Sequence, residues 1–500
     1  MPAFRFDNTY ARELPGFYTA WQPARVPAPQ LLYFNAALAE ELGLDAAALQ
    51  GDAGAAVFAG NVVPEGAEPL AQAYAGHQFG GFSPRLGDGR ALLLGEVVGT
   101  QGQRRDIALK GSGRTPYSRG GDGKAAVGPM LREVLIGEAM HALGIPTTRA
   151  LAVAATGERV LRERPWPGAV LTRVAASHLR VGTFQFFLAE GDLTKLRLLL
   201  DHAIARHDPA LAGTPGREMA FLRAVAQRQA TLIAQWMNVG FIHGVMNTDN
   251  MTISGETIDY GPCAFMEAYS PDTVFSSIDH GGRYAYGNQP GIARWNLARL
   301  AETLLPLVAD ENDEAAVQRV VAEATAVIDG FPALYAQALL QGQRAKLGLQ
   351  ATADDEEDGR LVDAWLALLQ SQAVDFTLAW RLLADAAEGQ PEALRDQFRD
   401  RAALDTWLQH WQVRLAQDNA ASPLPPAERA AAMRRVSPWV IPRNHQVEAA
   451  LAAATDGEMA PFHTLLAALQ RPFDSDAALA SFAVPAPAAE TAAYQTFCGT

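Results

Sequence analysis

The sequence predicts an α+β fold of two lobes, in which a small lobe of antiparallel strands precedes a larger helical lobe. Between residues 82 and 174, short apolar runs are separated by turn dipeptides such as Thr156-Gly157, a pattern typical of antiparallel strands. After about residue 190 the apolar residues recur at helical spacing. Arg217 to Asn238 is predicted to form one long helix that ends at Gly240.

These patterns divide the chain into five segments. An Ala/Leu-rich segment near Leu31 to Leu49 predicts a helix before the small lobe, and an Ala/Pro-rich stretch near the C-terminus predicts a linker. The expected segments are an N-terminal extension (1–60), the small lobe (61–189), the large lobe (190–345), an additional C-terminal helical region (346–483) and a tail (484–500).

The composition predicts a globular protein without general affinity for nucleic acid or anionic lipid. Of the 500 residues 49% are hydrophobic, and 55 acidic residues outnumber 41 basic ones, so any anion site must be local. The only cysteines, Cys263 and Cys498, exclude a disulfide framework and fit a reducing compartment. The sequence has no N-terminal signal segment and no run of about eighteen apolar residues. We expect a cytoplasmic monomer with no membrane or nucleic-acid partner.

The stretch HGVMNTDNMTISGETIDYG, residues 243–261, is similar to the catalytic and metal-binding motifs of protein kinases. His243 and Asn250 keep the spacing of the kinase H-R-D-x-x-x-x-N loop, and Asp259 begins a D-Y-G in place of D-F-G. Asn250 and Asp259 are therefore the predicted metal ligands, because Mg²⁺ prefers oxygen donors and bridges phosphates with few protein ligands.

The kinase base position is occupied by Val245, which cannot accept a proton. Asp249 lies beside the metal-binding Asn instead. The chain is therefore either catalytically inactive or performs a different reaction with the same nucleotide. His243 is expected to brace the loop.

The small lobe contains candidate nucleotide-binding residues in the kinase order. The glycine turn LGDGR lets backbone N–H groups approach phosphates, although such a turn is more often an ordinary hairpin. Lys110 ends a predicted strand, DIALK, and Glu133 lies on an apolar face of a helix predicted from Pro129 to Gly144. A buried Glu needs a cation, so Lys110 and Glu133 are predicted to pair, with Glu138 as the rival partner.

A glycine-rich basic loop follows Lys110. From Arg85 to Arg132 the chain has nine Lys/Arg against four Asp/Glu, a local positive excess within a chain of charge −14. This suits a polyphosphate better than a merely solvated loop. Arg173 and Arg180 add two cations just beyond.

With these motifs in view, the chain resembles the SelO family, also called YdiU, of kinase-like protein adenylyltransferases. The resemblance covers nearly the whole chain and is carried by GHQFGGFSPRLGDGRALLLGE, DIALKGSGRTPYSRGGDG, HGVMNTDNM, YGNQPGIARWNLARL and the terminal TFCGT. It implies a two-lobed protein-kinase-like fold.

The resemblance also implies transfer of AMP from ATP to Ser, Thr or Tyr hydroxyls of protein substrates, with release of diphosphate. In the family ATP is bound flipped relative to kinases, with its outer phosphates inside the pocket, and UMP transfer is a further expectation. Asp249 would be the proton acceptor, Glu133 would orient Lys110, and Asn250 with Asp259 would hold Mg²⁺ or Mn²⁺. The implied nucleotide contacts are Gly87, Gly89, Arg90, Lys110, Asp122, Gly123, Arg173, Arg180 and Asp259.

Three alternatives remain open at this point. A conventional phosphotransferase would release ADP, whereas a nucleotide-binding pseudokinase scaffold, suggested by Val245, would transfer nothing. A disulfide between Cys263 and Cys498 could gate the site; otherwise Cys263 is a small buried residue and Cys498 is inert.

Overall fold

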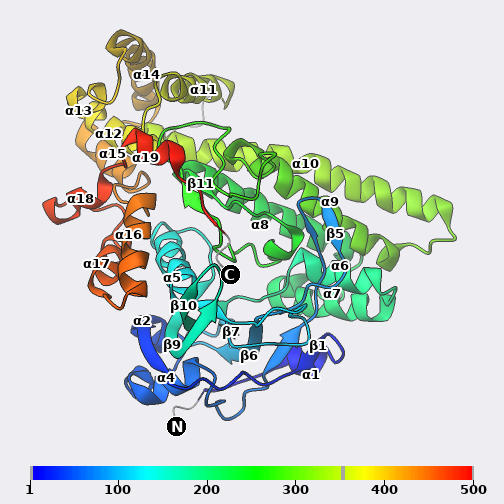
Figure 1. Ribbon diagram of the computed structural model, residues 1–500. Helices are drawn as coiled ribbons and strands as arrows, with labels where there is room; N and C mark the ends of the chain where they lie inside the picture. Colours follow the sequence, from blue (N-terminus) through cyan, green and yellow to red (C-terminus); the bar gives the residue numbers. More distant parts are fainter. Residues whose placement is uncertain (1–3, 351–354, 498–500) are drawn as a thin grey trace.

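The core of the molecule is an eight-stranded antiparallel sheet. The computed structural model describes residues 4–350 and 355–497 (Figure 1). The strand order is β1-β3-β6-β7-β10-β9-β2, and β8 pairs with β10 beside this path. The strands are β1 (Tyr18–Ala20), β2 (Gln30–Phe34), β3 (Leu70–Gln72), β6 (Ala91–Val98), β7 (Arg104–Lys110), β8 (Ala125–Ala126), β9 (Arg149–Leu161) and β10 (Pro165–Ala175).

The N-terminal residues complete the sheet. Strand β1 pairs with β3 at one edge, and β2 pairs with β9 at the other. The helix expected near Leu31 to Leu49 is therefore wrong in its first part, because Gln30–Phe34 is strand β2. The apolar run Leu-Leu-Tyr-Phe pairs in a sheet, and Asn35 then caps α2 (Ala36–Glu41) by accepting the Leu38 N–H at 3.0 Å.

Strands β9 and β10 are longer than the turn signals indicated. The turn expected at Thr156-Gly157 is wrong, because both residues lie inside β9 and the connection to β10 follows at residues 162–164. Gly157 is needed because its φ is +75° and because a Cβ there would lie 2.6 Å from the Cβ of Ala28.

Helix α5 (Val127–Ala142) packs between the sheet and two C-terminal helices, α16 (Asn444–Thr455) and α17 (Ala460–Leu469). Figure 1 shows α16 and α17 beside α5, on the side away from α8. One apolar cluster joins all three helices to β9 and β10, and it includes Met130, Val134, Val153, Leu171, Val447, Leu451, Phe462 and Leu465. The far end of the chain therefore holds the helix that carries Glu133.

The remaining helices form a larger layer built around α8 (Arg217–Val239). The prediction of this helix and its end is confirmed, since Gly240 adopts the left-handed conformation at φ +74°. Helices α9 (Gln289–Val308) and α10 (Glu314–Leu347) pack along α8. The other helices are α1 (Thr9–Glu13), α3 (Ala46–Leu49), α4 (Asp52–Phe58), α6 (Val181–Ala189), α7 (Leu193–His207), α11 (Asp355–Gln372), α12 (Phe376–Ala387), α13 (Glu392–Arg395), α14 (Arg401–Ala421), α15 (Pro426–Arg434), α18 (Ala480–Ala483) and α19 (Ala488–Ala493).

Two short hairpin sheets complete the fold. Strand β4 (Gly76–Gln78) pairs with β5 (Gly81–Ser83), and β11 (Phe241–Ile242) pairs with β12 (Ala264–Phe265). Within residues 4–350 and 355–497, no helix combines the length and the apolar character needed to span a bilayer. The exact limits of the five segments stay predictions.

Candidate active site

Four charged side chains from distant parts of the chain meet between the sheet and the α8 layer. Lys110 at the end of β7 contacts Glu133 of α5, and its Nζ lies 2.6 Å from Oδ1 of Asp259. Arg173 of β10 places Nη2 2.6 Å from both Oε2 of Glu133 and Oδ1 of Asp259. The rival Glu138 is instead bound by Arg149 at 2.6 and 2.7 Å. Two cations and two carboxylates thus form one closed cluster.

The cluster keeps both carboxylates ionised. Burial raises the pKa of Asp259, but Arg173, Lys110 and Arg180 outweigh it and hold this pKa well below its usual range. For Glu133, the same burial effect is outweighed by Arg173 and Lys110, which lower its pKa. The Asp259 side chain is 22% exposed, against 5% for Glu133. Asp259 is therefore the carboxylate that a ligand can reach.

The backbone at Asp259 is held in a rare conformation, with φ +61°. A non-glycine residue in this region costs about 1–3 kcal/mol, so the surroundings must impose it. The Gly261 N–H donates to the Asp259 carbonyl at 2.8 Å, and the buried Tyr260 hydroxyl bonds to Thr147. The contacts of Tyr260 and Gly261 thus hold the D-Y-G backbone in place and fix the orientation of the Asp259 side chain.

A small cavity opens beside the cluster. Lys110, Arg173 and Arg180 line it together with Gln72 and Asp88. Arg180 lies over the Tyr74 ring at 4.3 Å, with Nη1 3.9 Å from Asp88 and Nη2 3.9 Å from Asp259. Nε of Arg173 and Nε of Arg180 are buried without a hydrogen-bond partner among the described residues. Unpaired buried donors of positive charge are suited to an anionic ligand.

The glycine turn before β6 is closed by its own hydrogen bonds. The N–H groups of Gly87 and Asp88 donate to the carbonyls of Tyr74 and Gln72, at 3.1 and 2.9 Å, and Gly89 N–H donates to the Gly87 carbonyl at 2.8 Å. In this structure these groups are engaged within the chain, which differs from the free N–H groups expected from the sequence. Arg90 follows, half-buried, immediately before β6.

The two glycines instead allow a close approach of the basic loop. A Cβ on Gly87 would lie 2.3 Å from the Tyr117 ring, and one on Gly89 would lie 2.9 Å from the Tyr117 carbonyl oxygen. Thr115 Oγ1 donates to the Asp88 carbonyl at 2.6 Å, and Ser118 donates to the Gly89 carbonyl. The turn and the loop are therefore one packed unit.

We expect Gly87→Ala to lower stability and nucleotide affinity together. The substitution meets both a positive φ of +65° and the Tyr117 ring, whereas Gly120→Ala meets a positive φ of +94° with open space around it. Gly120→Ala should cost about 1 kcal/mol from backbone strain, and Gly87→Ala about 1–3 kcal/mol more from overpacking against the Tyr117 ring. Thermal unfolding and ATP titration of both variants test this. Equal unfolding temperatures would show that the contact with Tyr117 is unimportant.

Asp122 and Gly123 lie in the same basic loop but outside the cluster. Asp122 is bound by Arg162 at 2.8 Å and accepts the Lys124 N–H at 3.0 Å. Arg162 holds the pKa of Asp122 below its usual value. Gly123 adopts φ +68°, and a Cβ there would lie 2.1 Å from the Gly113 carbonyl oxygen. In this structure both residues shape the loop, and their contact with a nucleotide stays a prediction.

Asp249 is a buried carboxylate with one free oxygen. It lies in a short 3₁₀ helix, Thr248–Asn250, and Gln78 Nε2 donates to its Oδ2 at 3.2 Å. Its Oδ1 has no partner among the described residues. Burial raises the pKa of Asp249 to about 6. Such a carboxylate is chemically able to accept a proton near neutral pH.

Asn250 and His243 fix the loop around Asp249. Asn250 donates through Nδ2 to the Val245 carbonyl at 2.9 Å, which leaves its Oδ1 as an available donor oxygen. His243 is fully buried, stacks on Trp236, and places Nε2 2.9 Å from the Ile258 carbonyl. The bracing interpretation of His243 agrees with these contacts.

The oxygen donors present fit a hard divalent cation such as Mg²⁺ or Mn²⁺ better than a soft, thiolate-preferring metal. Within the described residues no group of three or more His, Cys, Asp or Glu side chains forms a metal cluster. Asn250 Oδ1 and the Asp259 carboxylate offer oxygen ligands only, as Mg²⁺ prefers. A magnesium ion bridging phosphates needs no more than this from the protein.

The sequence did not indicate the β4–β5 hairpin as part of the site. His77 N–H donates to Thr248 Oγ1 at 2.7 Å, and Gln78 Nε2 donates to Asp249. The hairpin therefore holds the loop that carries Asp249. A Cβ on Gly76 would lie 2.5 Å from Asp249 Oδ1. The closely spaced glycines around this hairpin were the available signal, because such residues mark close backbone approaches.

The C-terminal tail packs beside Cys263. The Cys263 thiol is fully buried, and burial raises its pKa to about 11. Thr496 Oγ1 donates to the Pro262 carbonyl at 2.7 Å, and Thr496 N–H donates to the Phe275 carbonyl at 2.8 Å. Cys498 lies outside the described residues, so its predicted disulfide with Cys263 stays a prediction.

Comparison with known proteins gives one consistent answer. The family model described as protein adenylyltransferase SelO matches residues 2–470. A protein nucleotidyltransferase YdiU of Chromobacterium violaceum is 61% identical over 485 residues, covering 96% of this chain and 99% of the relative. Proteins of the same name from Cereibacter sphaeroides and Rhizobium meliloti are 59% and 56% identical, covering 99% and 100% of this chain and all of each relative.

Proposed function

We propose that this chain, which belongs to the SelO family of protein adenylyltransferases, transfers AMP from ATP to hydroxyl groups of proteins. The premise is that the chain is a nucleotidyltransferase that acts on proteins. The proposed acceptors are Ser, Thr and Tyr side chains, and diphosphate is the leaving group. One observation carries the proposal. The buried Val245 occupies the position of the kinase base, whereas Asp249, a carboxylate whose pKa burial raises to about 6, lies four residues further on.

In this proposal the basic cavity takes the outer phosphates. Lys110, Arg173 and Arg180 would neutralise the diphosphate as it leaves, and Glu133 would keep Lys110 and Arg173 in place. ATP would then lie flipped relative to kinases, with its α-phosphate directed toward the acceptor. Charge neutralisation and positioning supply most of the rate in such transfers.

Asn250 and Asp259 would hold magnesium or manganese, which when bound supplies further positive charge to the phosphates. Asp259 Oδ1 is shared by Lys110 and Arg173, while among the described residues the contact of Oδ2 is the 3.9 Å one with Arg180. Oδ2 is therefore the more available donor oxygen. Asp249 would accept the proton of the attacking hydroxyl through its unpartnered Oδ1.

The deciding experiment compares two labels. The purified protein is incubated with a mixed protein substrate, magnesium or manganese, and ATP labelled at either the α- or the γ-phosphate. Label on protein from α-labelled ATP alone supports AMP transfer, and a parallel reaction with α-labelled UTP tests UMP transfer. Label from γ-labelled ATP alone would make the protein a phosphotransferase. Nucleotide binding without any label would favour a scaffold.

A further inference from the structure

His178 is a buried histidine held from one side only. It lies between β10 and α6, with 5% of its surface exposed. Its Nδ1 is 3.0 Å from Oδ2 of Asp106 on β7, and its backbone N–H donates to the same oxygen at 2.9 Å. Burial raises the pKa of Asp106, but Arg206 and His178 outweigh it and lower the value to about 2. Asp106 is therefore ionised and accepts the Nδ1 proton.

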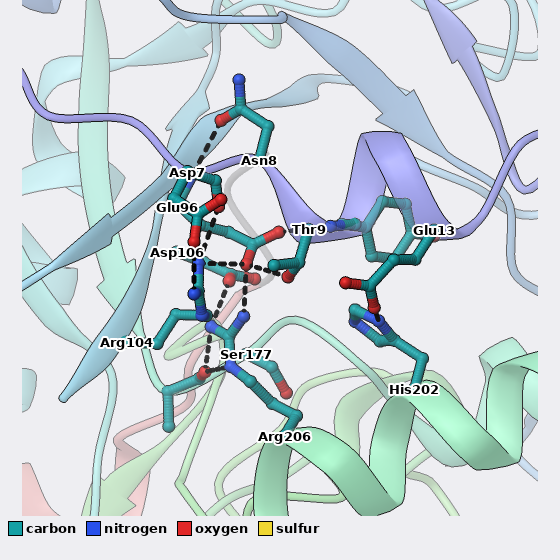
Figure 2. Close-up of polar contacts among 12 residues, drawn as sticks. Asp7, Asn8, Thr9, Glu13, Glu96, Arg104, Asp106, Ser177, His202 and Arg206 are labelled. Atoms are coloured by element: carbon teal, nitrogen blue, oxygen red, sulfur yellow. Dashed lines mark hydrogen bonds and ion pairs between the residues drawn. The ribbon is translucent and has the colours of Figure 1, made fainter.

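The carboxylate that holds His178 is itself fixed by a buried network. Figure 2 shows Arg206 of α7 between Glu96 of β6 and Asp106 of β7, at 2.7 and 2.6 Å. Glu96 in turn accepts the Tyr10 N–H at 2.5 Å. Three elements of the fold thus fix the direction in which the imidazole points, a degree of support that a merely space-filling ring does not need.

His178 lines the cavity with Lys110, Arg173 and Arg180, and its Nε2 has no partner among the described residues. Together with Nε of Arg173 and Nε of Arg180, three buried nitrogens on residues that line this cavity lack a partner within the part of the chain that the structure describes. A buried donor without an acceptor, such as each of the two Arg Nε atoms, costs about 1–3 kcal/mol, and a phosphate group offers several acceptor oxygens at once.

We propose that His178 is a further nucleotide ligand that donates from Nε2 to the outermost phosphate of ATP, an inference that rests on the proposed function. Because Asp106 binds Nδ1, Nε2 is the ring nitrogen that remains for the phosphate. The charged groups that face His178 come from β7, α7, β10, the glycine turn and its own segment: Asp106, Lys110, Arg206, Arg173, Asp88 and Arg180.

The test measures nucleotide binding by calorimetry for the full chain and two His178 variants. In His178→Asn the amide can still donate to Asp106 but does not reach the Nε2 position, whereas His178→Gln reaches it. We expect His178→Asn to weaken ATP binding about tenfold and to leave AMP binding within about twofold, because one charge-assisted hydrogen bond is lost. His178→Gln should recover part of the loss.

His202→Asn is the matched control, since His202 is equally buried and bonded to the carboxylate of Glu13 but does not line the cavity (Figure 2). It should bind ATP as the wild type does, and thermal unfolding without nucleotide checks that each variant folds. Unchanged ATP affinity in His178→Asn, or equal losses for ATP and AMP, would overturn the inference alone. A wild-type protein that fails to bind ATP would overturn the proposed function with it.

Discussion

Replacing Asp259 with asparagine is expected to lower AMP transfer by about 10³-fold or more, while the chain still folds. The carboxylate is contacted by Lys110 and Arg173 and is the proposed metal ligand, so one substitution removes both contributions. Glu133 still contacts both cations in the variant. The loss of folding free energy should therefore stay below the about 3–5 kcal/mol that follows when a buried ion pair loses its only partner.

Label transfer from α-labelled ATP and thermal unfolding measure these two effects separately. Asp418→Asn is the matched control. Asp418 is a buried carboxylate of α14, and one of its oxygens lies 2.9 Å from Nη1 of Arg429. Figure 1 places α14 at the opposite end of the molecule from β7. That variant should lose stability but keep its transfer rate. Transfer at the wild-type rate by Asp259→Asn would remove Asp259 from the site.

Replacing Asp249 with asparagine is expected to reduce transfer by about 10²–10⁴-fold without weakening ATP binding, because only the proton acceptor is lost. The pKa of about 6 adds a second signature. In the wild type, transfer should rise with pH, reach half its maximum near pH 6, and stay level above. Rates measured from pH 5 to 8 test this, and a profile that is flat across pH 6 would contradict the assignment.

The same substitution should raise stability at pH 8. The folded state keeps the Asp249 proton up to about pH 6, whereas the unfolded chain releases it near 3.8, so wild-type stability falls as pH rises between these values. The fall amounts to about 3 kcal/mol. Asp249→Asn removes this penalty, and its advantage in thermal unfolding should vanish near pH 3.5. An advantage that persists at low pH would point to packing instead.

The elements that could be predicted from sequence are those encoded locally. Helix α8 follows from one apolar stripe closed by Gly240, and α5 from a stripe between a proline and a glycine. Strand β2 was mispredicted because its partner β9 lies more than a hundred residues away, and the interior of β9 because it pairs with both β2 and β10. Local turn and helix preferences then lose to sheet pairing.

The same distinction holds for the site. The Lys110–Glu133 contact could be predicted, because a carboxylate on an apolar helix face requires a cation. The contacts of Arg173 with Glu133 and of Gln78 with Asp249 join residues 40 and 171 positions apart, and neither type of side chain signals its partner in the sequence. Long-range polar contacts of this kind appear only when the fold brings their elements together.

Helices α16 and α17 cover α5, so part of the packing around α5 can form only late in the synthesis of the chain. Helix α5 leaves the ribosome about three hundred residues before Phe462 and Leu465 are available to bury its outer face. Until then the outer apolar face of α5 is uncovered, and the helix that carries Glu133 packs against the sheet alone. The proposed nucleotide site therefore gains the full packing support of α5 only after α16 and α17 have been made, near the end of synthesis.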